Sequence, residues 1–236
     1  MSRIRVTHSG RNAAAWLPVF LLLVGSFLAV LLFDKDLYLE LVREGANTEL
    51  LTALFYLFTG ISFLVVACRR FRTGRSVGKV VLLVLLGAWL VFIGGEEESW
   101  GQWQFHYRVP DAVREVNLQK EVNLHNLSFL KRYPQLTDPH RILNLFILVS
   151  GILIPVAYKY NGRARALLNR LSFPVCPFAC VPLFVLALVY EKTAMAIWYH
   201  WSHTEATEFL FAVGILLYGI GVLRGDCHLP DRLPAG

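Results

Sequence analysis

Charged side chains are scarce in this chain. Asp, Glu, Lys and Arg make up only 17% of its 236 residues, whereas hydrophobic residues make up 56%. So few charges cannot cover the surface of a globular protein in water, and no stretch is both long and polar enough to form a separate water-soluble domain. We therefore expect the lipid bilayer to be the main partner of the protein surface.

Familiar nucleotide-binding and hydrolase motifs are also missing. The sequence contains no Walker-type phosphate loop, no HExxH, no GxSxG and no GxGxxG after a predicted strand, which disfavours nucleotide-driven transport and the familiar hydrolase chemistries. Its four cysteines form no CxxC pair, and three of them, Cys68, Cys176 and Cys180, lie in or beside apolar runs. We expect these three to be small buried hydrophobic residues.

The net charge of +6 does not indicate a nucleic-acid partner. The Lys and Arg residues lie mostly in short loops between apolar runs, where positive charge acts as a topology signal in membrane proteins. We expect no nucleic acid to bind. The oligomeric state stays open.

Apolar runs near the length of roughly 20 residues that crosses a bilayer recur along the chain. In lipid, such runs satisfy their backbone polar groups as helices. The sequence therefore predicts an all-α fold, a polytopic membrane bundle of about six transmembrane helices, in which residues 1–236 form a single integral membrane domain. The predicted spans are 13–33, 50–68, 77–95, 142–157, 173–190 and 209–223, and a long extramembrane loop covers 96–141.

The distribution of Lys and Arg predicts the orientation of the bundle. More of these residues lie on the side of the two termini than on the opposite side, which places both termini in the cytoplasm. The segments 34–49, 96–141 and 191–208 then share the non-cytoplasmic face. Most histidines and carboxylates of the chain lie in these segments, so we expect any chemistry on that face.

The first group of candidate residues closes the third span, where Glu96, Glu97 and Glu98 precede Trp100. Carboxylates at a helix C-terminus oppose the helix dipole, so local helix stability does not explain them. Consecutive helical positions are about 100° apart, and at most two of the three can face one site. The alternative is an acidic collar in water, with Trp100 as an interfacial anchor.

The second and third groups add histidines. Glu121 and His125, with Asn123 between them, would share one face of a helix, an arrangement that suits a metal or an orienting pair, although such pairs are also common on surfaces. His200 and His203 are three residues apart, as are Glu205 and Glu208. Near a helix N-terminus, Glu205 and Glu208 also favour the dipole, so part of this group has a purely structural explanation.

Glu49 opens the second span, and Glu191 is a weaker case of the same kind. A carboxylate near membrane depth is a functional candidate with a partner to be found. Carboxylate and imidazole ligands together suit Zn, Mn or non-haem Fe.

The leading hypothesis is a metal-dependent membrane enzyme, a hydrolase or an oxidoreductase, that acts on a lipid or amphipathic substrate at the non-cytoplasmic face. Its expected metal ligands are Glu97, Glu121, His125 and His200. Glu96 and Glu97 are the expected catalytic residues, with Glu96 as the general base, and Trp100 is expected to be a wall of the site. Further candidates are Glu49, Asn123, His203 and Glu208. The alternative is a proton- or ion-coupled transporter, or a non-enzymatic subunit of a membrane complex.

Two strings in the middle of the chain resemble a known pattern. The string from Glu96 to Gln102, EEESWGQ, and the string from Asn117 to Leu127, which ends in NLHNL, resemble the EE-x-SWGQ … NLHN signature of a family of uncharacterised bacterial multi-pass membrane proteins. The ELLTAL opening of the second span, from Glu49, belongs to the resemblance, whereas the WQFHYR stretch after Gln102 departs from it. The resemblance implies the bacterial inner (plasma) membrane and nothing about a substrate.

Overall fold

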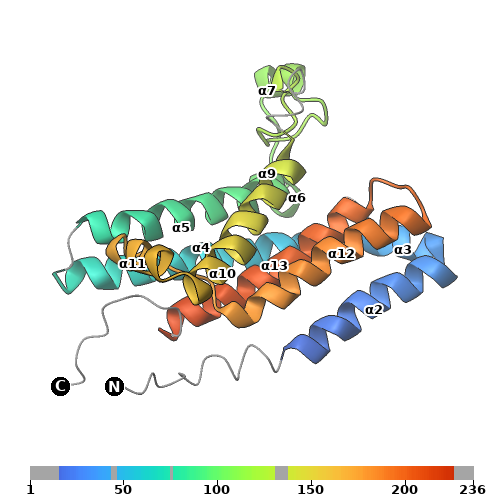
Figure 1. The fold of residues 1–236 in the computed structure, drawn as a ribbon. Coiled ribbons are helices and arrows are strands. Elements are labelled where there is room, and N and C mark those ends of the chain that lie inside the picture. Colours follow the sequence, from blue (N-terminus) through green and yellow to red (C-terminus); the bar gives the residue numbers. More distant parts are fainter. Residues whose placement is uncertain (1–15, 44–46, 75–76, 131–137, 226–236) are drawn as a thin grey trace.

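The computed structural model describes residues 16–43, 47–74, 77–130 and 138–225 (Figure 1). These residues form helices and loops, and among them an isolated bridge between Asn117 and Leu127 is the only β-type pairing. The prediction of an all-α bundle is confirmed.

Five helical segments of the described chain are long and apolar enough to cross a membrane, which supports a membrane-embedded protein. They correspond to α4 (Asn47–Arg72), most of α5 (Val77–Glu97), the run Pro139–Tyr160, α12 (Val181–Ile197) and α13 (His203–Leu223). The remaining predicted span, 13–33, corresponds to α2 (Leu17–Phe33), which has 17 residues and is shorter than the five segments above. Its predicted first residues, 13–15, lie outside the described residues.

Two observed helices differ clearly from their predicted spans. The span predicted at 173–190 begins eight residues later, as α12 at Val181 after a short 3-10 turn η4 (Phe178–Cys180), because Pro174 and Pro177 precede it and proline disfavours helix in the residue before it. Helix α12 therefore carries Glu191 within its last turns. Helix α13 begins at His203, six residues before the predicted 209, with Glu205 in its first turn.

Close packing between α4 and α5 depends on small residues. A Cβ on Gly60 would lie 2.7 Å from the Gly87 carbonyl oxygen, and one on Gly87 would lie 2.9 Å from that of Gly60. Because small residues let two backbones approach, the two helices form a tight antiparallel hairpin. The hairpin fixes the C-terminal end of α5 beside the first turn of α4.

Helix α13 packs on both α4 and α12. Thr59 of α4 donates a hydrogen bond to the Ile215 carbonyl, at 3.1 Å. On the other side, the buried ring of Phe184 from α12 fills the space over Gly214 of α13 and over Gly151 of the 139–160 run. One aromatic ring thus joins three helices.

The run from Pro139 to Tyr160 changes its winding halfway. It consists of α9 (Pro139–Phe146), a π-helix (Ile147–Leu153) and α10 (Ile154–Tyr160), and α11 (Gly162–Arg170) follows it. Pro155 has no backbone N–H to give to the preceding turn, which explains the wider winding before it. The run packs mainly on α12, whereas α5 packs mainly on α4.

Helix α2 and the short α3 (Lys35–Val42) lie along the other side of the bundle (Figure 1). Four residues of α2 at helical spacing face inward onto α12, namely Phe20, Val24, Phe27 and Leu31. From α3, the Tyr38 hydroxyl contacts the Tyr190 hydroxyl at 2.8 Å and His203 Nδ1 at 2.7 Å. These buried contacts fasten α3 to α12 and α13.

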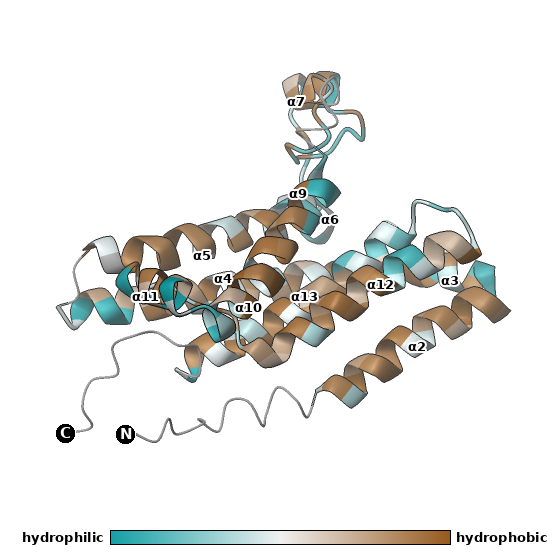
Figure 2. Ribbon diagram, in the orientation of Figure 1, coloured by the Kyte–Doolittle hydropathy of each residue, from teal (hydrophilic) through white to brown (hydrophobic). Residues whose placement is uncertain are grey.

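Hydrophobic residues run along the helices, and polar residues gather at their ends and in the loops (Figure 2). Large apolar side chains are exposed on the outer helix faces, as at Leu22, Leu85 and Leu145. Such faces suit lipid.

Six helix ends meet at one end of the bundle. They are the last residues of α2, α5 and α12 and the first residues of α4, α9 and α13, and the loop with α6 (Gln102–Phe105) and α7 (Asp111–Val116) projects from there (Figure 1). The described parts of 34–49, 96–141 and 191–208 thus share one end, as the sequence predicts.

Candidate active site at one end of the bundle

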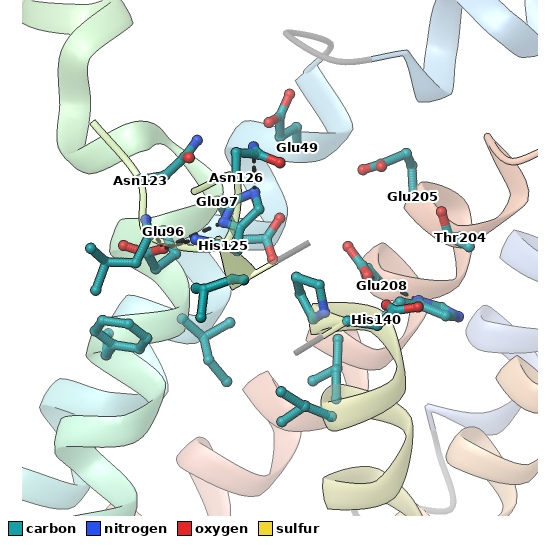
Figure 3. A pocket seen from close by; sticks show the side chains of 18 of the residues that line it. Glu49, Glu96, Glu97, Asn123, His125, Asn126, His140, Thr204, Glu205 and Glu208 are labelled. Atoms are coloured by element: carbon teal, nitrogen blue, oxygen red, sulfur yellow. Dashed lines mark hydrogen bonds and ion pairs between the residues drawn. The ribbon is translucent and has the colours of Figure 1, made fainter. Parts of the chain in front are cut away.

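A cavity of about 910 Å³ opens at this end of the bundle. It lies between α5 and the 117–130 loop on one side and α13 on the other, with α4 and α9 between them (Figure 3). Its polar lining comprises Glu49, Glu96, Glu97, Gln119, Glu121, Asn123, His125, Asn126, Asp138, His140, Thr204, Glu205 and Glu208. Six of the predicted site residues with a carboxylate or imidazole, which come from four separate parts of the sequence, therefore share one cavity.

Glu96 holds the loop against the end of α5. Its carboxylate accepts hydrogen bonds from the backbone N–H of Leu124 at 2.6 Å, from the backbone N–H of His125 at 3.1 Å, and from Trp100 Nε1 at 2.7 Å. The His125 ring lies 3.4 Å from the same carboxylate. With all these partners, Glu96 is better suited to positioning the loop than to the general-base role expected of it.

The segments 96–102 and 117–127 meet in space. Ser99 donates to Glu121 at 2.6 Å, Asn123 donates to Ser99 and to Glu121 at 3.0 Å each, and Gln102 accepts from the backbone N–H of Val122 at 2.9 Å. Residues 117–130 are an irregular loop that these hydrogen bonds close. The prediction that Glu121 and His125 share one face of a helix is therefore wrong. Both residues reach the cavity through the loop.

Trp100 does not line the cavity, contrary to its expected role as a wall. The backbone turns sharply here, with positive φ angles at Ser99 (44°), Trp100 (56°) and Gly101 (82°). This turn folds the indole back over Gly95, where a Cβ would lie 2.8 Å from the ring. Trp100 therefore braces Glu96 from outside the cavity.

Glu97 faces the cavity and differs from its neighbour. Within the described chain its carboxylate has no hydrogen-bond or ion-pair partner, although Glu49, Glu205 and Glu208 act on it electrostatically. Glu98 points elsewhere and accepts a hydrogen bond from Gln104. Two of the three carboxylates thus face one site, which is the maximum that helical geometry allows.

His140 is a site residue that sequence reasoning missed. At the start of α9, its Nδ1 lies 3.0 Å from Glu208 of α13 (Figure 3). Its Nε2 lies 3.4 Å from Glu191 of α12. Glu191 also lies 3.6 Å from Lys192, and its other carboxylate oxygen is buried without a described partner. The only signal in the sequence is a histidine that opens a span on the same face as the other candidates.

The histidines of the α12–α13 connection lie apart from this cavity. His203 is fully buried, and its ring is held by Tyr38 and, at 2.6 Å, by the Trp198 carbonyl. His200 stacks on Trp198, with ring centroids 4.6 Å apart, and does not line the cavity. His203 thus has a structural role, and His200 does not join Glu97 as a ligand here.

Metal coordination is not evident in this arrangement. Among the residues that the structure describes, no three His, Cys, Asp or Glu side chains lie close enough together to hold a metal ion. Three of the four expected ligands, Glu97, Glu121 and His125, do line the cavity. A shared ion would require them to move closer, because metal ligands lie within about 2.6 Å of the ion.

The cavity also has an apolar wall. Trp89, Phe92 and Ile93 come from α5, and Ile142 and Leu143 come from α9. Trp89 and Phe92 stack on each other, with ring centroids 6.0 Å apart. Polar groups at the mouth and apolar groups below them are the arrangement that binds amphipathic molecules.

Comparisons with protein-family models, with curated proteins and with solved structures give no match to this chain.

Proposed function

We propose that the protein is a membrane-embedded enzyme that acts on an amphipathic, lipid-like substrate in this cavity, and that the reaction is a hydrolysis. One observation carries the proposal: carboxylates and a histidine from four helices line a cavity that also has an apolar wall and lies at the helix ends. A reacting bond near the membrane boundary could meet both water and proton-transferring groups there.

Glu97 is the general base in this proposal. It faces the cavity without a hydrogen-bond partner in the described chain, so its carboxylate is available to take a proton from an attacking water. His140 is the proton carrier, since Glu208 and Glu191 fix the orientation of its ring. Glu96 acts only through the loop that it holds.

A metal-dependent form of this mechanism has a specific condition. A Zn, Mn or Fe ion would be held by Glu97, Glu121 and His125, and it would supply an activated water. Elemental analysis of purified wild type, Glu97→Gln and His125→Ala tests it. Near-stoichiometric metal that both variants lose supports this form, whereas wild type that stays free of metal after Zn, Mn or Fe is added rejects it.

An enzyme fits better than the alternative of a proton- or ion-coupled transporter. Glu97 and Glu49 lie at helix ends rather than midway along the bundle. Beyond the cavity, the described core is filled by large buried side chains such as Phe63, Phe184 and Phe211. A transport path would require polar groups through that region.

The proposed location is the bacterial inner membrane, with the cavity on the non-cytoplasmic face. The basic residues at the opposite end of the bundle support this orientation, as with Arg69, Arg70 and Arg72 at the end of α4. The resemblance of the two strings around Glu97 and His125 to the bacterial signature supports the choice of membrane.

Turnover of membrane lipids tests the enzyme proposal. Purified protein in nanodiscs made from bacterial lipid extract is incubated, and the products are identified by mass spectrometry. We expect Glu97→Gln to lower product formation by at least about 100-fold, the usual contribution of a general base. Glu115→Gln on α7, an exposed carboxylate outside the cavity, is the matched control. No product from wild type, or equal rates in both variants, contradicts the proposal.

A further inference from the structure

We infer that the occupant of the cavity is a lipid whose polar head is a positively charged amine, with its hydrocarbon chain lying between α5 and α9. This inference deepens the proposed function, because it names the chemical class of the substrate. It is argued from the charge of the cavity and from the position of its apolar wall.

The charge argument depends on which carboxylates already have a basic side chain beside them. Glu96 has His125, Glu191 has Lys192 and His140, and Asp138 has Arg141 at 3.3 Å. The Glu97 carboxylate has no hydrogen-bond or ion-pair partner in the described chain. Within the same residues, the Glu121 carboxylate accepts hydrogen bonds only from the neutral groups of Ser99 and Asn123.

Burying uncompensated carboxylates is costly, so a ligand that brings a positive charge gains where a neutral or negative one does not. The described residues that line the cavity include no Lys or Arg to hold a phosphate or carboxylate head. The part of the lining that the structure describes is therefore complementary to an amine without a phosphate group.

The chain argument depends on how the wall is built. Trp89, Phe92 and Ile93 of α5 face the same cavity as Ile142 and Leu143 of α9. The two helices have different main packing partners, α4 and α12. The wall is thus formed by two helices that pack mainly on other elements rather than on each other.

The apolar wall also continues toward lipid. Further along the two helices, Val84 and Leu85 of α5 and Leu145 and Val149 of the 139–160 run are exposed. These side chains offer the chain a continuous apolar surface from the cavity to the bilayer. A soluble polyamine would leave this wall uncovered, whereas a lipid covers it.

Photo-crosslinking of matched probes tests the inference without any turnover. The probes are a long-chain primary amine, the alcohol and the carboxylic acid of equal length, each with a diazirine and an alkyne in the chain. They are added to wild type in nanodiscs, and labelled peptides are quantified by mass spectrometry. We expect the amine to label the peptides around Trp89–Ile93 and Ile142–Leu143 about tenfold more than the alcohol, and the acid least.

Two variants separate the head from the chain. Glu97→Gln should reduce amine labelling to the level of the alcohol and leave alcohol labelling unchanged, whereas Glu115→Gln should change neither. Ile142→Trp, at a partly exposed position that tolerates bulk, should reduce labelling by both probes. Thermal unfolding of each variant in nanodiscs confirms that it is folded.

Equal labelling by amine and alcohol, or amine labelling that Glu97→Gln leaves unchanged, overturns the inference. Labelling that Ile142→Trp does not change overturns the placement of the chain. Because binding is measured apart from turnover, an amine preference without turnover refutes only the enzyme proposal. Turnover of neutral lipids without an amine preference refutes only this inference.

Discussion

Glu96 and Glu97 are adjacent carboxylates with opposite surroundings. Glu96 accepts two backbone N–H groups and an indole N–H and holds the loop. Glu97, one helical position on, faces the cavity without such partners in the described chain. The geometry at the end of α5 therefore gives two identical side chains different roles. Glu96 holds the loop in place, and Glu97 is available for the proposed reaction.

Replacing Glu96 should release the loop. Glu96→Gln removes the negative charge that strengthens the bonds from Leu124, His125 and Trp100 and turns one acceptor oxygen into an amide donor, so at least one N–H group loses its partner, at a cost of about 1–3 kcal/mol. We expect faster hydrogen exchange in residues 117–130, measured by mass spectrometry. Glu98→Gln, next in the chain and bonded to Gln104, is the control and should leave exchange there unchanged. Unchanged exchange in Glu96→Gln would show that other bonds suffice to close the loop.

The sequence predicts a large part of the cavity but not all of it. Glu49, Glu96, Glu97, Glu121, His125 and Glu208 all line it, because the order of apolar spans already places their segments at one end. His140 escaped prediction because its partners Glu191 and Glu208 are 51 and 68 residues away. The spacing of His200 and His203 led to a wrong prediction that both belong to the site, because spacing in the sequence does not show that His203 faces the core.

At the scale of the elements, the short helix α3 is held in place by a buried polar cluster of Tyr38, Tyr190 and His203. The Tyr38 hydroxyl contacts both Tyr190 and His203, which belong to α12 and α13. His203 opens α13, the helix that carries Thr204, Glu205 and Glu208 into the cavity. The cluster thus positions one whole side of the site.

Removing the Tyr38 hydroxyl should loosen this attachment. Tyr38→Phe deprives Tyr190 and His203 of a buried partner, and we expect a loss of about 1–3 kcal/mol in unfolding free energy. The measurement is thermal unfolding in detergent. Tyr199→Phe, at a position that is 88% exposed, is the control and should unfold like wild type. Equal stability of the two variants would show that the cluster contributes little.

The ring of Phe184 makes the spacing of three helical elements sensitive to a single methyl group. A Cβ on Gly214 would lie 2.6 Å from the ring, so Gly214→Ala should cost about 1–3 kcal/mol through overpacking. Thermal unfolding measures the loss. Gly162→Ala, where nothing lies within 4 Å, should cost little from contact.

A second substitution distinguishes overpacking from a general effect of alanine. Phe184→Leu in the Gly214→Ala background removes part of the ring from the crowded space, so we expect part of the lost stability to return. A double variant that is less stable than Gly214→Ala by the full cost of Phe184→Leu alone would contradict this explanation.

The helix boundaries show where sequence reasoning stops at this scale. Hydropathy alone extended the fifth span over 173–177, but Pro174 and Pro177 keep this stretch out of helix. The π-helix before Pro155 likewise cannot be predicted from the hydropathy of the segment. Its wider winding depends on the backbone N–H that proline lacks, which leaves a carbonyl of the preceding turn without a hydrogen-bond donor. Apolar periodicity finds the helices, and proline adjusts their ends and winding.

For the whole molecule, the orientation in the membrane decides which compartment the cavity faces. We expect the cavity to face the non-cytoplasmic side of the membrane and α11 to lie on the cytoplasmic side. Single cysteines test this in a chain whose native cysteines are replaced by serine. Leu118→Cys, near the cavity, should react with a membrane-impermeant maleimide in intact cells, and Gly162→Cys, at the opposite end, only after permeabilisation. The reverse pattern would place the cavity in the cytoplasm.

The position of α13 in the chain, after the other helices that line the cavity, has a consequence for biosynthesis. The ribosome synthesises α4, α5 and α9 before α13, and α13 supplies Thr204, Glu205 and Glu208 to the lining. Until then Thr59 lacks its acceptor on α13, and Phe184 covers only Gly151. The lining described here is completed only when α13 has been made. A truncated chain would thus carry half of a site, and quality-control proteases would meet it with unpaired polar groups exposed.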